Sequence, residues 1–388
     1  MNNNRRPSEP SNIRVSSSAR SANSGSAVSG NHSDKPVRSK KYIIIRVMVY
    51  VLIAIVGIGI GAMSYLFVVL GPVSIITPFV KAEDYVPIDI GSLDDYDLNG
   101  NTSSDWVDGG HTRVYVDPNF PIKLVAQKDK NVENILVFGI DSRGSDDIQC
   151  RADAIMIVSL DNNSKEIKLI SLMRDTGVTI EGRSSLDKLG HSYAYGGVGL
   201  LINTINDNYG LDIQRFVMLD FNSSAQVIDQ IGGIELEVKS QEVKYANLNI
   251  DEQNALFGTS VAYLTHEGYQ TLTGNQAVAW ARIRYSDSDF VRTSRQRILV
   301  SMIMQKVASL GRMDQLSVLE DVAGLFETNM NTIDLIRVGT TGTELIKNMS
   351  EYRVPEDGLY SVQQNPWMMV VDWENQIAAL HEYIWGES

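Results

Sequence analysis

The chain has 388 residues, enough for about two domains of ordinary size and for a core that needs no disulfide or metal. Its 34 lysines and arginines against 47 aspartates and glutamates give a formal net charge of −13, which argues against a general nucleic-acid binder. A single cysteine, Cys150, excludes a disulfide framework and a multi-cysteine zinc site, and none of the five histidines forms an HxxxH or HxH pair. Any bound metal must therefore be held by carboxylates.

The first 46 residues are basic although the chain is acidic. They carry nine basic side chains against Glu9 and Asp34, a local charge of +7 that leaves −20 for the remainder. This tail is rich in Ser, Asn, Arg and Pro, a composition that cannot bury a core. We predict that residues 1–46 form a disordered cytoplasmic tail.

An apolar stretch without any acid or base follows the tail. Val47–Leu70 would form a helix about 36 Å long, enough to cross a hydrocarbon core of roughly 30 Å. The stretch is too long and begins too late for an ordinary secretory signal. Because the positive charge precedes it, we predict a single-pass cell-membrane protein with a cytoplasmic N-terminus and an extracellular remainder.

Residues 71–130 are expected to form an extracellular stalk or a small accessory region. Turn sequences such as Asn99-Gly100-Asn101 interrupt any long period. Two short runs, Thr112–Val116 and Ile122–Val125, have the composition of strands and favour an ordered module slightly over a bare linker. No chemistry is indicated in this region.

Three strand-like runs follow residue 131. Ile135–Ile140 and Ala154–Leu160 are apolar runs of strand length, and Glu166–Leu172 alternates apolar and polar side chains. The turn sequence Asp161-Asn162-Asn163-Ser164 joins the last two runs. A β-hairpin is therefore predicted over residues 154–172.

The turn predicts which side chains meet across this hairpin. If the hairpin is centred between residues 163 and 164, the numbers of cross-strand partners sum to 327 and Asp153 falls opposite Arg174. Asp141 follows the first run, and it would begin the loop that ends near Asp153. Two carboxylates would then meet Arg151 and Arg174 at one edge of the sheet.

Such a cluster allows two interpretations. Two carboxylates without cysteine or paired histidine are the oxygen ligands that Mg²⁺ prefers, and arginines beside them are bidentate donors for phosphate oxygens. The same residues would equally form a salt-bridge network that satisfies itself. The charge pattern of this segment alone does not separate the two.

A second basic cluster favours the anion site. Five arginines occur within sixteen residues, namely Arg282, Arg284, Arg292, Arg295 and Arg297. The first two would point the same way from an extended segment, whereas Arg292, Arg295 and Gln296 have the spacing of one helix face. A capping box at residues 273–276 predicts a short helix that brings the first pair to a defined place.

These segments, taken in order, resemble the LytR-CpsA-Psr domain. The motifs lie within residues 131–310 and are Asn134–Gly139 with Asp141-Ser142-Arg143, Arg151-x-Asp153, Ser171-x-x-Arg174-Asp175, Lys188 with Ala194-Tyr195-Gly196-Gly197, Ile231-Gly232-Gly233-Ile234, Leu272-x-Gly274 with Gln276-Ala277, and Arg282-x-Arg284 followed by Asp289-Phe290-x-Arg292-x-x-Arg295-Gln296. A basic tail, one membrane helix and an external catalytic domain are also the usual layout of that family. The resemblance implies an α/β fold, an α-β-α sandwich with a mixed central sheet and a hydrophobic tunnel for a lipid tail, spanning residues 131–388.

The resemblance also implies a reaction. Members of the family are phosphotransferases that move wall glycopolymers, such as teichoic acids and capsular polysaccharides, from a polyprenyl-diphosphate carrier to peptidoglycan. The expected partners are therefore a polyprenyl-diphosphate-linked glycan, peptidoglycan and the membrane. No nucleic-acid partner is expected.

Site residues carry over by position. Asp141 and Asp153 match metal-binding aspartates, which makes Mg²⁺ the implied cofactor. The positions that match the diphosphate site are Arg151, Arg174, Arg282, Arg284, Arg292 and Gln296. Lys188 and Arg295 are added as expected diphosphate ligands, with a surface lysine as the alternative for Lys188. Arg174 is expected to be catalytic, and Asp153 or Asp175 to accept the proton of the attacking hydroxyl.

Several apolar and glycine segments have less specific interpretations. Val198–Ile205 and the Phe216–Ile228 region would line a lipid tunnel, but periodic apolar segments are more often ordinary core, which is the expectation here. Gly196-Gly197 and Gly232-Gly233 are expected to be turns. His191 is expected to be structural.

The chain departs from the family pattern in two places that spare the charged residues. Met173 stands where proline is usual, and the freed backbone N–H predicts a looser strand end with the chemistry intact. Ala152 stands where serine is common. After residue 331 the match weakens, but helices over Ile333–Met349 and Trp373–Trp385, with strands between them, are expected to complete the same domain.

Two other functions fit the same residues. A polyprenyl-diphosphate hydrolase differs only in using water as the acceptor. A membrane-bound regulator would bind polyprenyl phosphate without turnover, and it need not keep the charged set in full. The intact set therefore favours an enzyme, while the sequence does not separate a hydrolase from a transferase.

Overall fold

The computed structural model describes residues 79–81, 120–140, 151–284 and 289–386. The chain divides into two compact units, residues 1–60 and 61–388, and every described residue belongs to the second. The predicted cytoplasmic tail, the predicted membrane span and Asp141 lie outside the described residues. Within the described ranges, no helix is long and apolar enough to cross a membrane.

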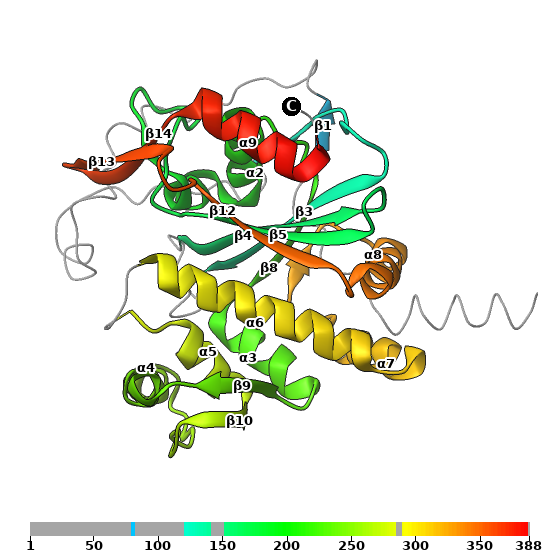
Figure 1. Cartoon of the computed structure of the whole chain (residues 1–388), viewed down its shortest axis with the longest axis vertical. Helices are drawn as coiled ribbons and strands as arrows, with labels where there is room; N and C mark the ends of the chain where they lie inside the picture. The colour runs from blue at the N-terminus through cyan, green and yellow to red at the C-terminus, as the bar shows by residue number, and fades with distance from the viewer. Residues whose placement is uncertain (1–78, 82–119, 141–150, 285–288, 387–388) are drawn as a thin grey trace, which may run out of the picture. The chain divides into compact units, whose positions relative to one another are not determined.

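A six-stranded mixed sheet is the centre of the folded unit (Figure 1). Its strand order is β11-β8-β3-β4-β5-β12, with parallel pairing of β3 to β8 and of β5 to β12 and antiparallel pairing elsewhere. The strands are β3 (Val132–Ile140), β4 (Ala152–Asp161), β5 (Glu166–Leu172), β8 (Arg215–Leu219), β11 (Glu327–Thr328) and β12 (Met349–Val354).

Strands β3, β4 and β5 are largely apolar because both faces of the sheet are covered. Successive side chains of a strand point to opposite faces. Accordingly Leu136 and Ile157 belong to one hydrophobic cluster, and Ile135 and Val158 belong to another. This explains why the sequence shows nearly continuous apolar runs here instead of a strict alternation.

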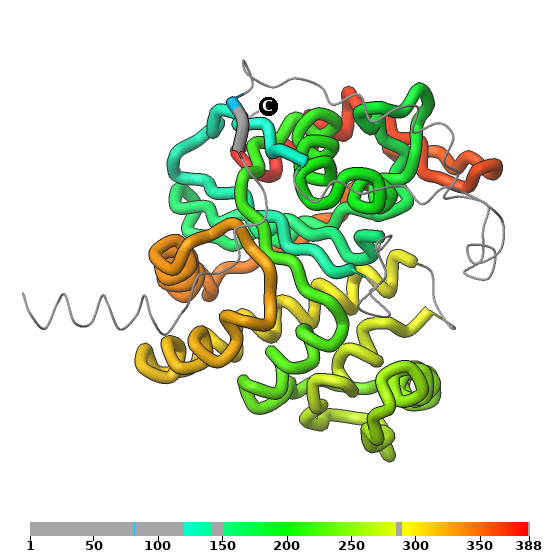
Figure 2. The backbone as a smooth tube through the Cα atoms, turned by 180° about the vertical axis from the view of Figure 1, so that it is seen from behind, coloured from blue at the N-terminus to red at the C-terminus, as the bar shows by residue number. Residues whose placement is uncertain are grey.

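Helices form a layer on each face (Figures 1 and 2). One layer contains α2 (Leu189–Tyr209) and α9 (Trp373–Trp385), and the other contains α6 (Asp289–Ser309) and α8 (Thr332–Leu345). The implied α/β sandwich with a mixed sheet is therefore confirmed. The run Val198–Ile205 lies in α2 and is buried core, as expected.

A second group of helices packs around its own hydrophobic cluster beyond α6. It consists of α3 (Phe221–Gln230), α4 (Ser240–Phe257), α5 (Gly274–Ala281) and α7 (Arg312–Val322), with the antiparallel strands β9 (Ile234–Val238) and β10 (Gly268–Leu272). The capping box at the start of α5 is present, since the Thr273 backbone N–H donates to Gln276 Oε1 at 3.0 Å.

Three small strand pairs complete the described structure. They are β1 (Phe79–Lys81) with β2 (Ile122–Leu124), β6 (Gly177–Val178) with β7 (Asp187–Lys188), and β13 (Tyr360–Gln364) with β14 (Trp367–Val371). Phe120 and Ile122 are buried in the same core as α2. The folded unit thus includes residues before the predicted boundary at 131.

The hairpin register is the one predicted from the turn. Pairs run from Ile155 with Leu172 to Asp161 with Glu166, and each pair sums to 327. β3 is antiparallel to β4 and ends at Ile140, the residue before Asp141. The chain leaving β3 and the chain entering β4 therefore lie at the same end of the sheet.

Two local expectations need correction. Met173 does not loosen the strand end, because its N–H donates to the Val354 carbonyl at 2.8 Å and ties β5 to β12. Gly196 and Gly197 form a kink within α2 instead of a turn, with Gly197 at φ +62°. Gly232 and Gly233 do form a turn between α3 and β9, with φ near +80°.

Candidate functional site

Two cavities open at the end of the sheet where strand β3 ends and strand β4 begins. The larger, about 390 Å³, is lined by Gly139, Asp153, Ala154, Phe221, Asn249, Glu252, Arg282, Arg284, Arg292 and Gln296. The smaller, about 60 Å³, is lined by Arg151, Ala152, Asp153, Arg174, Asp175, Lys188, Gly190 and His191. Both clusters predicted from the sequence therefore meet in space, and Asp153 belongs to both cavities.

Arg174 lies just after β5 and is held by two carboxylates. Its Nη1 donates to Asp153 Oδ1, and its Nε donates to Asp175 Oδ2 at 3.3 Å. Burial alone would lower the pKa of Arg174, but the charges of Asp153, Asp175 and Asp289 outweigh burial and raise it. Arg174 is thus a fixed cation, and its predicted meeting with Asp153 is observed.

Two further cations complete this half of the site. Arg284 Nη2 lies 3.6 Å from Asp153 Oδ2, and Lys188 Nζ lies 3.1 Å from Asp175 Oδ1. The Arg284 side chain is half exposed, whereas that of Lys188 is 18% exposed. Lys188 is therefore part of the charged cluster and not an isolated surface lysine.

Arg292 is the most buried arginine of the site, with a side chain only 3% exposed. Its Nη2 lies 2.5 Å from Asp289 Oδ1 in an ion pair, but this contact lacks hydrogen-bond geometry. Within the described ranges, neither Nε nor Nη2 of Arg292 donates a hydrogen bond. Buried N–H donors without acceptors cost free energy unless a ligand supplies the acceptor, so Arg292 is suited to bind an anion.

Arg282 follows α5 and, like Arg292, has a buried guanidinium nitrogen that makes no hydrogen bond within the described part of the chain. Its Nη2 donates to Glu252 Oε2 at 3.2 Å, and its guanidinium lies over the Phe221 ring at 4.3 Å. Among the described residues, its buried Nη1 has no hydrogen-bond partner. Arg282 and Arg284 both line the larger cavity, which agrees with the prediction that they point the same way.

Arg295 is the one described residue of the predicted set that the structure places elsewhere. Its Nε donates to Glu242 Oε1 at 3.0 Å, and it lines a separate cavity with Trp280. Residues four apart on a helix differ by about 40° and residues three apart by about 60° in the opposite sense. Arg292 and Gln296 therefore reach the site together, while Arg295 turns away.

Asp289 is a site residue to which sequence reasoning gave no role. It begins α6 and pairs with Arg292 three residues later. Burial raises the pKa of Asp289, and the nearby charges of Asp175 and Asp153 add to this effect against those of Arg174 and Arg284. The i, i+3 spacing of Asp289 and Arg292 was the signal that would have indicated the pair.

A buried hydrogen-bond network borders the smaller cavity through His191. Asp187 Oδ1 lies 2.8 Å from His191 Nδ1, and Tyr195 donates its hydroxyl to Asp187 Oδ2 at 2.7 Å. Burial would raise the pKa of Asp187, but these bonds lower it to about 2. Burial lowers the pKa of His191, which favours its neutral form, and its bond to Asp187 gives it a structural role, as expected from the sequence.

The charge balance of the two cavities is positive. Six cationic side chains line them against three carboxylates, Asp153, Asp175 and Glu252. When Asp289 is included, the described residues still keep a formal excess of two positive charges. A ligand with two or three negative charges would neutralise this excess.

Sequence comparison places these residues in a family. A profile of the LytR_cpsA_psr family matches residues 101–381. The chain belongs to the LytR_cpsA_psr family. The match includes every described residue that lines the two cavities, and it extends past the motifs into α9.

Relatives of this LytR_cpsA_psr protein carry the name polyisoprenyl-teichoic acid–peptidoglycan teichoic acid transferase TagU. The Bacillus anthracis protein is 28% identical over 228 residues, which covers 58% of this chain and 69% of the relative. The Halalkalibacterium halodurans protein is 30% identical over 194 residues, covering 49% and 58%. A solved structure, TagT bound to LIIa-WTA, is similar with a TM-score of 0.54 and 25% identity over 68% of this chain and 93% of that one.

The donor chemistry of the LytR_cpsA_psr site is compatible with Mg²⁺. In the described part of the chain, no group of three acidic, histidine or cysteine side chains could hold a metal. Mg²⁺ is usually bound by one or two carboxylates, with phosphate oxygens and waters completing its shell. Asp153 is a carboxylate that lines both cavities, so it fits this pattern as one of the carboxylate ligands.

Proposed function

We propose that the protein is a membrane-anchored phosphotransferase that moves a glycopolymer from a polyprenyl-diphosphate carrier to peptidoglycan. The observation that carries this proposal is the set of buried guanidinium nitrogens on Arg282 and Arg292 that make no hydrogen bond among the described residues, in the site that also holds the ion-paired Arg174. The names of the TagU relatives describe the same kind of transfer, with teichoic acid as the polymer.

The donor diphosphate matches the site in charge and geometry. It brings two or three negative charges to a cluster with a formal excess of two positive charges among the described residues. Guanidinium groups bind phosphate oxygens through two parallel N–H bonds. Arg282, Arg292 and Gln296 would hold the diphosphate in the larger cavity, and Arg174 would face it from across Asp153.

The transfer is a displacement at phosphorus. A peptidoglycan hydroxyl oxygen attacks the glycan-bearing phosphorus, and a new P–O bond forms as the P–O bond to the lipid phosphate breaks. The lipid monophosphate leaves with the electron pair, and the hydroxyl proton passes to a carboxylate, Asp153 or Asp175. Arginine donors stabilise the charge on the leaving phosphate, each worth about 2.7 to 4 kcal/mol by analogy with oxyanion-hole donors.

Mg²⁺ is proposed as the cofactor, held by Asp153 and by Asp141, which lies outside the described residues. When bound, it would neutralise charge on the diphosphate oxygens. The anchoring is likewise proposed from the sequence, with one transmembrane helix over residues 47–70, a cytoplasmic N-terminus and an extracellular catalytic domain.

The test uses the full-length chain in detergent micelles with a labelled polyprenyl-diphosphate glycan, peptidoglycan and Mg²⁺. The wild type should release lipid monophosphate and link the label to peptidoglycan, and Arg174→Ala should lose both. Arg337→Ala is the matched control, because Arg337 pairs with Glu133 at the far end of the sheet.

The outcomes separate the alternatives. Release of lipid phosphate without linkage to peptidoglycan would identify a hydrolase. Binding of the donor without any release would identify a regulator, and chelation of Mg²⁺ tests the metal in the same assay.

A further inference from the structure

The hairpin β13–β14 has no role in the chemistry described above, yet it reaches the site. Figure 1 shows it projecting beyond the layer of α2 and α9. Trp367, the first residue of β14, is 39% exposed. A single exposed aromatic side chain needs no explanation by itself, so its surroundings decide its meaning.

The base of the hairpin is fixed to the chain that carries the catalytic cluster. The Met369 N–H donates to the Asp175 carbonyl at 2.9 Å, and Met369 forms a parallel bridge with Thr176. A Cβ at Gly177 would lie 3.0 Å from Met368 Sδ, so glycine lets the hairpin approach closely. The hairpin is therefore positioned by the residues that directly follow Arg174.

The hairpin is also held from the second half of the site. The rings of Phe290 and Tyr360 lie 6.2 Å apart, and the Arg353 guanidinium stacks over Phe290 at 4.3 Å. Phe290 is the neighbour of Asp289 at the start of α6. Both halves of the site thus contact the hairpin, which makes its position a fixed part of the site.

The exposed indole lies beside the charged cluster. Lys188 Nζ is 5.8 Å from the centre of the Trp367 ring and 3.1 Å from Asp175 Oδ1. Asp175 in turn accepts from Arg174. Trp367 is therefore one side chain away from the smaller cavity, whereas Arg282 and Arg292 line the larger one.

We infer that Trp367 and the hairpin β13–β14 form the subsite for the acceptor glycan, a chain of β-1,4-linked N-acetylhexosamines. This inference rests on the proposed function and names the surface that presents the acceptor hydroxyl to the smaller cavity. A pyranose ring has an apolar C–H face that packs on an indole, while its hydroxyl and amide groups require polar neighbours.

The surface fits a glycan better than a lipid. Gln364 is the cross-strand partner of Trp367, and it and the adjacent Asn365 are exposed and can hydrogen-bond to sugar hydroxyls. A polyprenyl tail needs an enclosed apolar cavity, whereas Trp367 is open to solvent. Arg282 and Arg292 line the larger cavity, so donor and acceptor would reach Asp153 through different cavities.

The experiment compares Trp367→Ala and Trp367→Phe with Ile333→Ala in the full-length chain. Ile333 is an exposed apolar side chain, 67% exposed, next to the far ion-pair cluster that includes Asp334. KM is measured for soluble uncrosslinked glycan strands and separately for the lipid donor, with the melting temperature as a check on folding. Trp367→Ala should raise the acceptor KM about three- to tenfold and leave the donor KM unchanged. Trp367→Phe should stay within about twofold of wild type.

A binding measurement keeps this test independent of turnover. Saturation-transfer NMR with a soluble N-acetylglucosamine–N-acetylmuramic acid oligomer should show contacts in the wild type and in Ile333→Ala that are lost in Trp367→Ala. If the acceptor KM and this binding are unchanged in Trp367→Ala, or if donor and acceptor KM rise together, the inference is wrong. Glycan binding through Trp367 without lipid phosphate release would instead overturn the proposed function and leave the subsite standing.

Discussion

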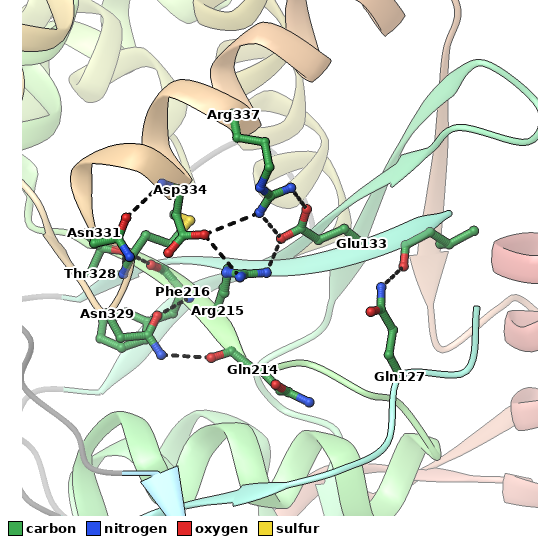
Figure 3. Close-up of polar contacts among 12 residues, drawn as sticks. Gln127, Glu133, Gln214, Arg215, Phe216, Thr328, Asn329, Asn331, Asp334 and Arg337 are labelled. Atoms are coloured by element: carbon green, nitrogen blue, oxygen red, sulfur yellow. Dashed lines mark hydrogen bonds and ion pairs between the residues drawn. The ribbon is translucent and has the colours of Figure 1, made fainter. Parts of the chain in front are cut away.

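Two arginine–carboxylate clusters lie at opposite ends of the central sheet, and they differ in how completely they satisfy themselves. Glu133 and Arg215, at the starts of β3 and β8, meet Asp334 and Arg337 of α8 (Figure 3). The site cluster, made of the charged residues that line the two cavities, lies at the other end, where Gly139 of β3 lines the larger cavity. Ligands bind at the carboxyl ends of strands in many open α/β sheets, and the candidate site lies at the carboxyl end of β3 in this protein.

The far cluster, Glu133, Arg215, Asp334 and Arg337, is closed, in the sense that its charges and hydrogen bonds are satisfied by its own members. Arg337 makes two bonds to Glu133, at 2.6 and 2.9 Å, and Arg215 bonds both Glu133 and Asp334. Two cations face two carboxylates, and none of these four side chains has a buried polar atom without a partner. Burial would raise the pKa of Glu133, but hydrogen bonds and charges from Arg337 and Arg215 lower it.

The site cluster is open, in the sense that its charges and hydrogen-bond donors are not fully satisfied among the described residues. Its described cations outnumber its carboxylates, and buried donors on Arg282 and Arg292 have no acceptor among the described residues. Burial raises the pKa of Asp289 there instead of lowering it. The two clusters use the same residue types, so composition does not distinguish them, whereas the unmet hydrogen-bonding capacity of the buried arginine nitrogens does.

The largest effect is expected at Arg295, which sits on α6 with Arg292 but belongs to a closed pair. Removing one partner of a buried ion pair typically costs about 3 to 5 kcal/mol. Arg295→Ala should therefore lower the free energy of unfolding by about this amount in a denaturant titration. Arg292→Ala, from the open cluster, should cost less stability and lose donor affinity, and the reverse pattern would break the comparison.

Arg174→Ala should lower the rate of lipid phosphate release about 10²- to 10³-fold, because it removes a donor to the developing charge. The measurement is single-turnover release from the labelled donor. Arg337→Ala should keep the wild-type rate. Equal losses in the two variants would mean that the far cluster also acts in catalysis or that both changes unfold the chain, and the melting temperatures would separate these cases.

Glu133→Gln should destabilise the fold by about 1 to 2 kcal/mol without changing the rate of transfer. Hydrogen bonds to charged groups are worth about 1.5 to 3 kcal/mol, and the partial exposure of Arg215 and Arg337 reduces this value. Chemical denaturation at pH 7 measures the loss. The folded pKa of Glu133 lies below the ordinary 4.5, so its contribution is present above that pH and is lost as the pH falls through the folded pKa.

Asp289→Asn should raise the stability of the fold, whereas Glu133→Gln should lower it. This is the smallest of the expected effects. The folded pKa of Asp289 lies above the ordinary 3.8, so ionisation destabilises the folded state at pH 7 and has no effect below both pKa values. The variant should be slightly more stable than wild type at pH 7, with the difference vanishing as the pH falls below about 4. A loss of stability at pH 7 would show that Asp289 behaves like Glu133.

Local patterns predicted those parts of the fold that depend on neighbouring residues. The turn at residues 161–164 fixed the hairpin register, and with it the meeting of Asp153 and Arg174. The capping box placed α5, and the amphipathic run Trp373–Trp385 gave α9 with its observed bounds. Each of these features is determined within about 20 residues of sequence, where periodicity and turn chemistry act directly.

The sequence by itself therefore determined the hairpin and the meeting of Asp153 with Arg174, while the layered fold followed from the family resemblance. The tertiary structure decided which cations remain available to a ligand, because that depends on partners distant in sequence. Arg295 is paired with Glu242 of α4, and the Met173 N–H donates to the carbonyl of Val354 in β12. The hairpin that carries Trp367 is bonded to the backbone of Asp175. Burial and long-range pairing set the free energy of each charge, and neither is encoded in the local spacing of residues.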